Sequence, residues 1–429
     1  MLALLALRSL VAHRRRALLL LGVAAGAGAL LATAFSVQAE VTRAHRRAVT
    51  TLISGDLNVG GFFKAHPDAI APVIADARPV RSAAERVLPT ACSVRERGRG
   101  TVVLGAGQHR LGAYVSGIDV AREAGLAQAF ELRSGSMAGL SAARTVALSE
   151  PLATRLSVGV GDLVTLFATT VRGERGAVDA QVVAVTGNAG LLAETAGVVM
   201  SNATLAELAG YGPNALGVLQ IMCDPGVDLG ALAGSIREAL GVQFELLPPV
   251  HEAFGDKVAP LLREAWAGQR LDVSSWEDEG AFLSFVTDGL AALTFVTALT
   301  VLGAVLAGLF VFLSVSVRER TREIGTLRAL GMARGAVVAM VLMEGAAVGL
   351  GASALGLAAF TTASWTLGSS VSVPEGLVAL FMIRKLELQL GLSEAVRVVC
   401  WICGGAAAAS IVPAARAAAL QPRLAMEAL

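Results

Sequence analysis

Hydrophobic residues gather in four long stretches that contain no charged residue, whereas the rest of the chain is punctuated by polar and turn-forming residues. Each stretch is close to or longer than the ~20 residues that an α-helix needs to cross the hydrocarbon of a bilayer. The pattern therefore predicts four transmembrane helices. The four stretches are residues 17–39, 289–317, 345–374 and 398–415.

The segment between the first two stretches has a different texture. Residues 40–285 alternate short apolar runs with Gly, Pro and Asp, which is typical of a soluble α+β domain. Within it we expect a short helix over residues 147–156, a turn, and then strands over 163–169 and 180–185 that pair as a hairpin. Residues 252–266 are expected to begin a helix that leads into the second span.

The composition is typical of a membrane protein, and the distribution of charge predicts which ends of the spans face the cytoplasm. Of the 429 residues 55% are hydrophobic and 16% charged, with a net charge of +1, and the mean hydropathy of +0.65 is high for a soluble chain. Arginines cluster at alternate ends of the spans, which the positive-inside rule places in the cytoplasm. Both termini are then cytoplasmic. These arginines are Arg14, Arg15, Arg16, Arg318, Arg320, Arg322, Arg328, Arg334, Arg416 and Arg423.

The predicted fold class is a membrane α-helical protein of four transmembrane helices with a large extracytoplasmic α+β domain inserted between helices 1 and 2. A cleaved signal peptide ending at Val37-Gln38-Ala39 is the alternative for the first span, but the apolar run exceeds the roughly 7 to 15 residues of such signals. The predicted division is 1–39 (interfacial helix and first span), 40–285 (external domain), 286–317 (second span), 318–334 (cytoplasmic helix), 335–363 (third span), 364–396 (external segment), 397–415 (fourth span) and 416–429 (cytoplasmic tail).

Four cysteines divide between two environments. Cys92 and Cys223 lie in the external domain, where an oxidising periplasm would permit a disulfide, but their spacing leaves the pairing open. Cys400 and Cys403 have the spacing of a redox motif inside an apolar span, where we interpret them as packing residues.

The sequence lacks the residue patterns of a catalytic site. His251-Glu252 is followed by Gly255 where a zinc-protease helix needs its second His, and no Gly-x-Ser-x-Gly elbow occurs. Lys64, Lys257 and Lys385 are the three lysines, and none follows the Gly that a phosphate-binding Walker A loop requires. We therefore expect a non-catalytic chain that holds no cofactor or metal and takes any ATP-derived energy from another subunit.

A short basic amphipathic segment separates the second and third spans. Ile324, Leu327 and Leu330 recur every three residues and are expected to share one helical face, with Gly331 ending the helix. Such a helix lies on a membrane surface or docks into a partner. Glu344, within the third apolar region, is a candidate functional acid, with pairing to Arg334 or to a neighbouring helix as the alternative. Small residues suited to close helix packing are Gly22, Gly26, Gly345, Gly349, Gly351 and Gly356.

Residues 322–331, followed by Glu344-Gly345 in the next span, resemble the coupling region of the FtsX-like permeases of ABC transporters, the superfamily of MacB and LolC/LolE. The end of the chain, from Pro413-Ala414-Ala415-Arg416-Ala417-Ala418 to Glu427-Ala428-Leu429, resembles the ending of that family. The predicted helix, turn and hairpin of residues 148–185 resemble the core of its periplasmic domain. The order of one span, a large domain and three spans is also the layout of the family.

The resemblance implies a stand-alone permease subunit in the inner membrane of a bacterium. Two copies, or two paralogues, would associate with two cytoplasmic ABC ATPase subunits that bind ATP and Mg. ATP-driven closure would then move the periplasmic domains, which is mechanotransmission. The implied ATPase-coupling residues are Arg322, Glu323, Ile324, Gly325, Leu327, Arg328, Leu330 and Gly331.

Three functions fit this resemblance. The first is release or export of lipoproteins or other hydrophobic cargo, with a periplasmic lipoprotein, a chaperone and membrane lipids as partners and no nucleic acid. The second is an FtsX-like scaffold that activates a cell-wall hydrolase, although its external domain would normally be much shorter. The third is a MacB-like efflux component that works with a membrane-fusion protein. A merely anchored sensor would leave the coupling segment unexplained.

Overall fold

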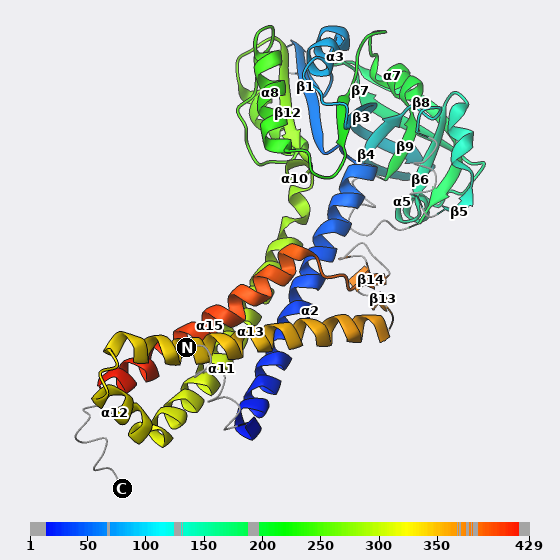
Figure 1. Ribbon diagram of the computed structural model, residues 1–429. Helices are drawn as coiled ribbons and strands as arrows, with labels where there is room; N and C mark the ends of the chain where they lie inside the picture. Colours follow the sequence, from blue (N-terminus) through cyan, green and yellow to red (C-terminus); the bar gives the residue numbers. More distant parts are fainter. Residues whose placement is uncertain are drawn as a thin grey trace. The chain divides into compact units, whose positions relative to one another are not determined.

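The chain divides into two compact units (Figure 1). The helical unit contains Met1–Thr42, Thr287–Val373 and Lys385–Leu429, and the sheet unit contains Arg43–Val286 and Pro374–Arg384. The predicted interfacial helix and most of the predicted C-terminal tail lie outside the residues that the structure describes. The computed structural model describes residues 14–66, 69–123, 130, 132–187, 197–366, 368, 370–374, 377–378, 380 and 385–419.

In the part of the helical unit that the structure describes, four helices are long and one is short. They are α2 (Arg14–Leu52), α11 (Ser284–Glu319), α12 (Thr321–Ala329), α13 (Arg334–Thr366) and α15 (Leu392–Ala419), and a small antiparallel pair is formed by β13 (Ser370–Ser372) and β14 (Lys385–Glu387). Among the described residues, four helices are long and apolar enough to cross a membrane, and each overlaps one predicted stretch: Leu18–Leu52, Ala281–Glu319, Arg334–Thr366 and Leu392–Ala419. With the sheet unit inserted after the first, they fit a membrane protein that carries an external domain.

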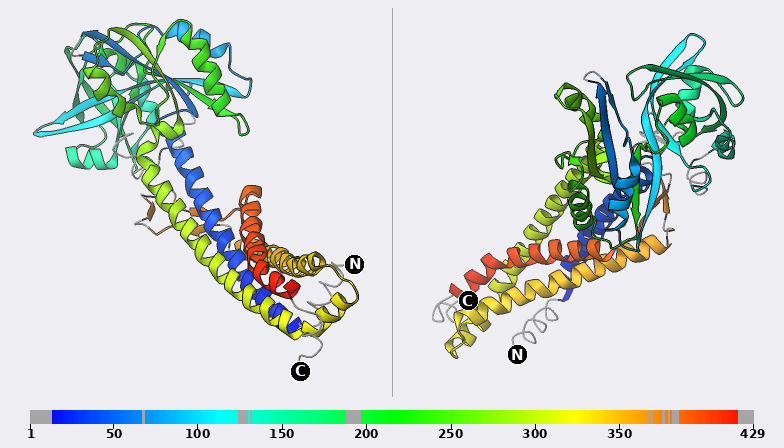
Figure 2. Two further views of the ribbon diagram at one scale, coloured as in Figure 1. Left: turned by 90° about the vertical axis from the view of Figure 1, so that its left-hand side faces the viewer. Right: turned by 90° about the horizontal axis from the view of Figure 1, so that it is seen from above.

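Helices α13 and α15 pack closely because α13 presents glycines to α15, and Figure 2 shows the two helices side by side. A Cβ on Gly349 would lie 2.9 Å from Cβ of Ala406, and one on Gly345 would overlap Oγ of Ser410. Real Cβ atoms essentially never approach another heavy atom so closely. The contact therefore requires glycine at both positions, as the small-residue spacing predicted.

Helix α2 meets α13 at Gly356, which the sequence suggested, and through Gly28 of α2, which it did not suggest. A Cβ on Gly356 would lie 2.7 Å from the backbone oxygen of Ala25, and Gly28 faces Ala352 at 3.6 Å. Gly22 and Gly26 have nothing within 4 Å of an added Cβ. The predicted contacts of Gly22 and Gly26 are thus not made within the described part of this chain, because the face of α2 that turns toward α13 passes through Gly28.

The strands of the sheet unit form one extended sheet with the order β11-β12-β1-β10-β3-β4-β9-β6-β8-β5, to which β2 and β7 add side pairings. Their bounds are β1 (Leu57–His66), β2 (Ala69–Ala71), β3 (Cys92–Ala106), β4 (His109–Ile118), β5 (Leu132–Gly135), β6 (Thr145–Ser149), β7 (Leu163–Thr169), β8 (Arg175–Thr186), β9 (Val198–Ser201), β10 (Val218–Cys223), β11 (Glu245–Leu246) and β12 (Gly268–Ser275). The helices and 3-10 turns are α3 (Ala77–Glu85), η1 (Met137–Ser141), α5 (Glu150–Leu156), α7 (Asn202–Ala209), α8 (Leu229–Gly241), η2 (Phe254–Lys257), α9 (Val258–Arg263), α10 (Trp276–Glu279) and η3 (Ala281–Leu283).

The long strand β3 belongs to two lobes of this sheet. Its first half, residues 92–97, pairs with β10, and its second half, residues 98–106, pairs with β4 and β7. The second half is part of a closed circuit of pairings, β3-β4-β9-β6-β8-β7-β3, which we call the barrel lobe. The strands β11, β12, β1 and β10 form the open lobe, whose apolar face packs against α3 and α8. The barrel lobe has its own apolar interior, to which β3, β4, β6, β7, β8 and β9 all contribute.

The expected hairpin is confirmed, since β7 covers Leu163–Thr169 and pairs antiparallel with β8. The expected helix over residues 147–156 is confirmed only from Glu150 onward, because the preceding residues form β6. Strand β6 is buried between β8 and β9, so its apolar run carries no alternation that distinguishes a strand from a helix. The helix expected over residues 252–266 is wrong as a lead into the second span, because β12 intervenes before α11.

Cys92 and Cys223 form a disulfide, which answers the pairing that the sequence left open. Cys92 begins β3 and Cys223 ends β10, and the two residues are direct partners in the antiparallel register of these strands. The bond closes a sequence separation of 131 residues and links the first residue of β3 to the last residue of β10. Disulfides persist in oxidising compartments, so this bond is consistent with a sheet unit outside the cytoplasm.

Removal of the disulfide by the double substitution Cys92→Ser with Cys223→Ser should destabilise the protein by about 2–4 kcal/mol, because a large loop of the unfolded chain is no longer closed. Chemical unfolding of the purified full chain in detergent measures this change. The matched control is Cys400→Ser with Cys403→Ser, which removes two free thiols. Equal stability of the two double variants would contradict the structural role of the disulfide.

Gly356→Ala should destabilise the helical unit by about 1–3 kcal/mol, because the added methyl group meets backbone atoms that cannot rotate away. Gly404→Ala is the control, since Gly404 lies in α15 with nothing within 4 Å of an added Cβ. Thermal unfolding in detergent compares the two variants. The packing of α2 on α13 is misassigned if both variants unfold at the wild-type temperature.

Candidate functional site

The connection between α11 and α13 contains the predicted coupling helix. Helix α11 ends at Glu319, Arg320 links it to α12, and α13 begins at Arg334. Gly331 has φ of +98°, a left-handed conformation that glycine adopts readily, and its N–H donates to the carbonyl oxygen of Arg328 at 3.1 Å. The predicted termination of the helix at Gly331 is confirmed.

Ile324 attaches α12 to the rest of the helical unit. Its side chain is 1% exposed and packs in a cluster formed with residues of α11, α13 and α15, including Leu313, Val337 and Ala414. Burial of one such side chain contributes about 1.5–3 kcal/mol. The inner face of α12 is thus held by its own chain.

The predicted common face of Ile324, Leu327 and Leu330 is wrong for its last member. Leu330 is 80% exposed, whereas Leu327 is half-buried. An α-helix turns by about 100° per residue, so six residues fall about 120° short of two full turns. A spacing of three therefore drifts around the helix, and Leu330 leaves the face that Ile324 occupies.

The eight predicted coupling residues separate into two groups by exposure. Ile324 and Gly325 are buried, and Leu327 and Arg328 are half-buried, so these four hold the helix in place. The exposed face combines charged and apolar groups, which is the chemistry of a protein contact. The exposed members are Arg322, Glu323, Leu330 and Gly331.

Glu344 is bound by Arg320 and not by Arg334. The Nη1 of Arg320 donates to Oε1 of Glu344 at 2.7 Å, and its Nε donates to Glu323 at 3.0 Å. Their side chains are 14% (Arg320) and 4% (Glu344) exposed. Arg334 begins the helix that carries Glu344 and lies about 15 Å along its axis, too far for contact. The alternative prediction, that Glu344 is paired with a cation, is confirmed, but the cation is Arg320, which follows α11, and not Arg334.

The electrostatics of Arg320 follow from this geometry. Burial disfavours its charge, but hydrogen bonds and charge from Glu323 and Glu344 outweigh burial and raise the pKa of the guanidinium above its ordinary value. Arg320 stands in the basic run that the sequence singled out, yet it was not among the candidate site residues. The signal for it was Glu344 itself, an acid in an apolar helix that needs a cation nearby.

The last turns of α15 form the surface on which α12 rests. Ala414 and Ala417 of α15 belong to the cluster around Ile324, and Arg328 donates from Nη1 to the carbonyl oxygen of Ala418 at 3.0 Å. A cation at the last turn of a helix satisfies carbonyl groups that have no partner within the helix. The two sequence motifs that carried the family resemblance are therefore in contact with each other.

Within the described residues, no three His, Cys, Asp or Glu side chains come together as metal ligands. The site consists of an anchored helix, an exposed face and two internal ties, Arg320 to Glu344 and Arg328 to Ala418.

The helices that form this site match a known protein family. Residues 294–421 match the family described as "FtsX-like permease C-terminal". This part of the chain is therefore similar to the C-terminal part of FtsX-like permeases. The match includes α12, α13, α15 and both internal ties, so the resemblance drawn from the sequence is confirmed.

Two solved structures similar to this chain come from external regions of transporters. The periplasmic region of MacB from Actinobacillus actinomycetemcomitans is 10% identical with a TM-score of 0.31, over 55% of this chain and 95% of that one. The extracellular domain of the noncanonic ABC-type transporter YknZ from Gram-positive bacteria is 10% identical with a TM-score of 0.28, over 43% and 95%. No match was found among curated proteins. The similarity to a known family rests on the match of residues 294–421.

Glu344→Gln should destabilise the protein by about 1–3 kcal/mol, because Arg320 then keeps its charge in a mostly buried site without the carboxylate at its Nη1. Thermal unfolding in detergent measures the change. Glu394→Gln is the control, because its partner Arg397 is 46% exposed and regains water when the pair is lost. A Glu344 variant as stable as the Glu394 variant would show that the buried pair contributes no more to stability than the exposed pair.

Proposed function

We propose that this protein is an FtsX-like permease, the membrane subunit of an ABC transporter, and that α12 is the surface on which a cytoplasmic ATPase docks. The carrying observation is the division of α12 into an anchored face and an exposed face. A docking helix must transmit movement, so it has to be fixed to its own chain on one side and open to its partner on the other. Ile324 and Leu330 represent these two sides.

Charge and the disulfide support the orientation that this proposal needs. Arginines concentrate at the α12 end of the spans, which favours a cytoplasmic position for α12 and for both termini. The bond between Cys92 and Cys223 favours an oxidising compartment for the sheet unit. The proposed location is the inner membrane of a bacterium, with the sheet unit in the periplasm.

The proposed mechanism is mechanotransmission without passage of cargo through the helices. Nucleotide-driven closure of two ATPase subunits would displace α12 in each of two permease copies or paralogues. Because α12 is tied to α13 by Arg320 and Glu344 and to α15 by Arg328, its displacement would shift the long helices as packed bodies. The sheet unit, joined to α2 and α11 by continuous helix, would then act on lipoprotein or other hydrophobic cargo in the periplasm.

Leu330→Glu tests the docking surface. Leu330 is 80% exposed, so its replacement should leave folding unchanged, whereas a charge at an apolar contact should weaken the ATPase complex at least about tenfold, or ~1.4 kcal/mol. The measurement is the amount of ATPase that co-purifies with the tagged chain from its native membranes. Glu323→Arg should have the same direction of effect, because it also places a second cation beside Arg320.

Val242→Glu is the matched control, since Val242 is 81% exposed and lies in the sheet unit. It should retain the full amount of ATPase. Undiminished ATPase with Leu330→Glu would refute α12 as the docking surface, and absence of any ATPase from the wild-type complex would refute the proposed function.

A further inference from the structure

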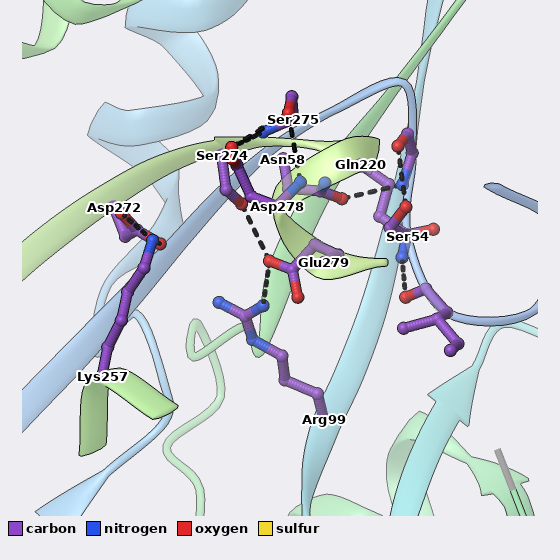
Figure 3. Close-up of polar contacts among 12 residues, drawn as sticks. Ser54, Asn58, Arg99, Gln220, Lys257, Asp272, Ser274, Ser275, Asp278 and Glu279 are labelled. Atoms are coloured by element: carbon purple, nitrogen blue, oxygen red, sulfur yellow. Dashed lines mark hydrogen bonds and ion pairs between the residues drawn. The ribbon is translucent and has the colours of Figure 1, made fainter. Parts of the chain in front are cut away.

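A layer of buried polar side chains lines one face of the open lobe (Figure 3). Alternate residues of β1, β10 and β12 face the apolar core under α3 and α8, and the residues between them are Asn58, Gln220, Asp272 and Ser274, all at most 4% exposed. Burial of polar groups is unfavourable unless they are hydrogen-bonded. We therefore expect these side chains to be hydrogen-bonded, and their hydrogen-bond partners show which segments of the chain the layer connects.

The layer joins the residues that follow α2 to the start of α10, which precedes α11 in the chain. Strands β1 and β12, which follow α2 and precede α10, are direct neighbours in the sheet. The N–H of Trp276 donates to the carbonyl oxygen of Asp56 at 3.1 Å, and Gln220 Nε2 donates to the carbonyl oxygen of Ile53 at 2.8 Å. Ser275 and Asp278 form a capping box at the start of α10. We call residues 49–58 and 272–280 the hub, because these contacts fix them to one another.

Arg99 reaches the hub from β3. It follows Gly98, the residue at which the pairing of β3 changes from β10 to β4, so its backbone belongs to the barrel lobe. Its side chain, 16% exposed, points into the hub, where Nη1 lies 3.4 Å from Oε1 of Glu279 (Figure 3). The same oxygen of Glu279 accepts a hydrogen bond from Oγ of Ser274 at 2.8 Å.

The guanidinium of Arg99 is enclosed on its other sides. It stacks 3.1 Å from the ring centroid of Phe254, which itself stacks on Phe62 of β1. A Cβ at Gly60 of β1 would overlap Nη2 of Arg99. Burial lowers the pKa of this guanidinium, and the charges of Glu279 and Asp272 oppose that shift. This site requires the guanidinium of an arginine, whose flat face stacks on Phe254 while its edge bonds to Glu279. The ammonium group of a lysine is a compact point charge and cannot make both contacts.

We propose that Arg99 is a positioning residue that makes the barrel lobe move as one body with the start of α11. This inference rests on the proposed function, in which α11 delivers movement to the sheet unit. The backbone connects the lobes at β3 and again between α7 and β10. Such connections bend more readily when no buried ion pair and stacked ring also hold them. Loss of the guanidinium leaves the backbone connections intact and removes the tie to Glu279.

The test uses the full chain in lipid nanodiscs, with spin labels at exposed Glu277 in the hub and exposed Leu163 in the barrel lobe. The background carries Cys400→Ser and Cys403→Ser, so that no other free thiol reacts. The wild type should give one narrow distance distribution, and Arg99→Lys should lose it and give a broad one. Glu279→Gln, which keeps the size and the Ser274 contact, should broaden the distribution in the same way.

Arg97→Lys is the matched control. Arg97 lies two residues earlier on β3, is more deeply buried than Arg99 (2% against 16% exposed), and pairs with Glu123 and not with the hub. It should lower the unfolding temperature to a similar extent and keep the narrow distance. A narrow distribution with Arg99→Lys, or a broad one with Arg97→Lys, would overturn the assignment of Arg99.

A second measurement separates this inference from the proposed function. In the complex with the co-purified ATPase, addition of ATP and vanadate should leave the distance between the two labels unchanged in the wild type and shift it in Arg99→Lys, because the hub then moves without the barrel lobe. If no ATPase associates and ATP shifts neither protein, the proposed function fails, while the broadening in lipid still decides the role of Arg99.

Discussion

The ion pair between Arg320 and Glu344 determines the geometry of the connection between α11 and α13. A carboxylate within an apolar helix requires a cation, and the only way for Arg320 to supply it is for the chain to reverse immediately after α11. That reversal sets α12 against the bundle and brings Ile324 into the cluster of α11, α13 and α15. The exposed face of α12 follows from this constraint, since the side that carries Ile324 is already occupied.

The same constraint depends on close approach of the helices. Gly345 lies beside Glu344 and lets α15 come near enough for Ser410 to occupy the space of a side chain. With α15 at this distance, Ala417 reaches the cluster under α12, and the carbonyl oxygen of Ala418 meets Arg328. The small residues of the C-terminal motif and the charged residues of the coupling segment therefore form one structure, although about 90 residues separate them in sequence.

The sequence predicts those features that depend on short-range pattern. Uncharged runs locate the spans, and Gly331 locates the end of α12, because hydrophobic length and a left-handed turn need no knowledge of the fold. Features set by helix phase or by chain reversal were missed. Leu330 turned away from the face assigned to it, and Arg320 was overlooked because its partner lies on another helix. The bond of Cys92 to Cys223 depended on the register of two strands that no spacing reveals.

Helix α11 runs without interruption from Ser284 to Glu319, and each of its ends adjoins a buried ion pair. Arg320 follows it and binds Glu344, and Glu279 precedes it and lies against Arg99. A continuous helix resists bending and stretching because every residue in its interior is hydrogen-bonded along the axis. Directional, charge-assisted contacts at the ends, combined with non-directional apolar contacts between them, allow such a helix to shift within its surroundings while keeping hold of what it moves. This distribution of interactions is the one that a transmitting element needs.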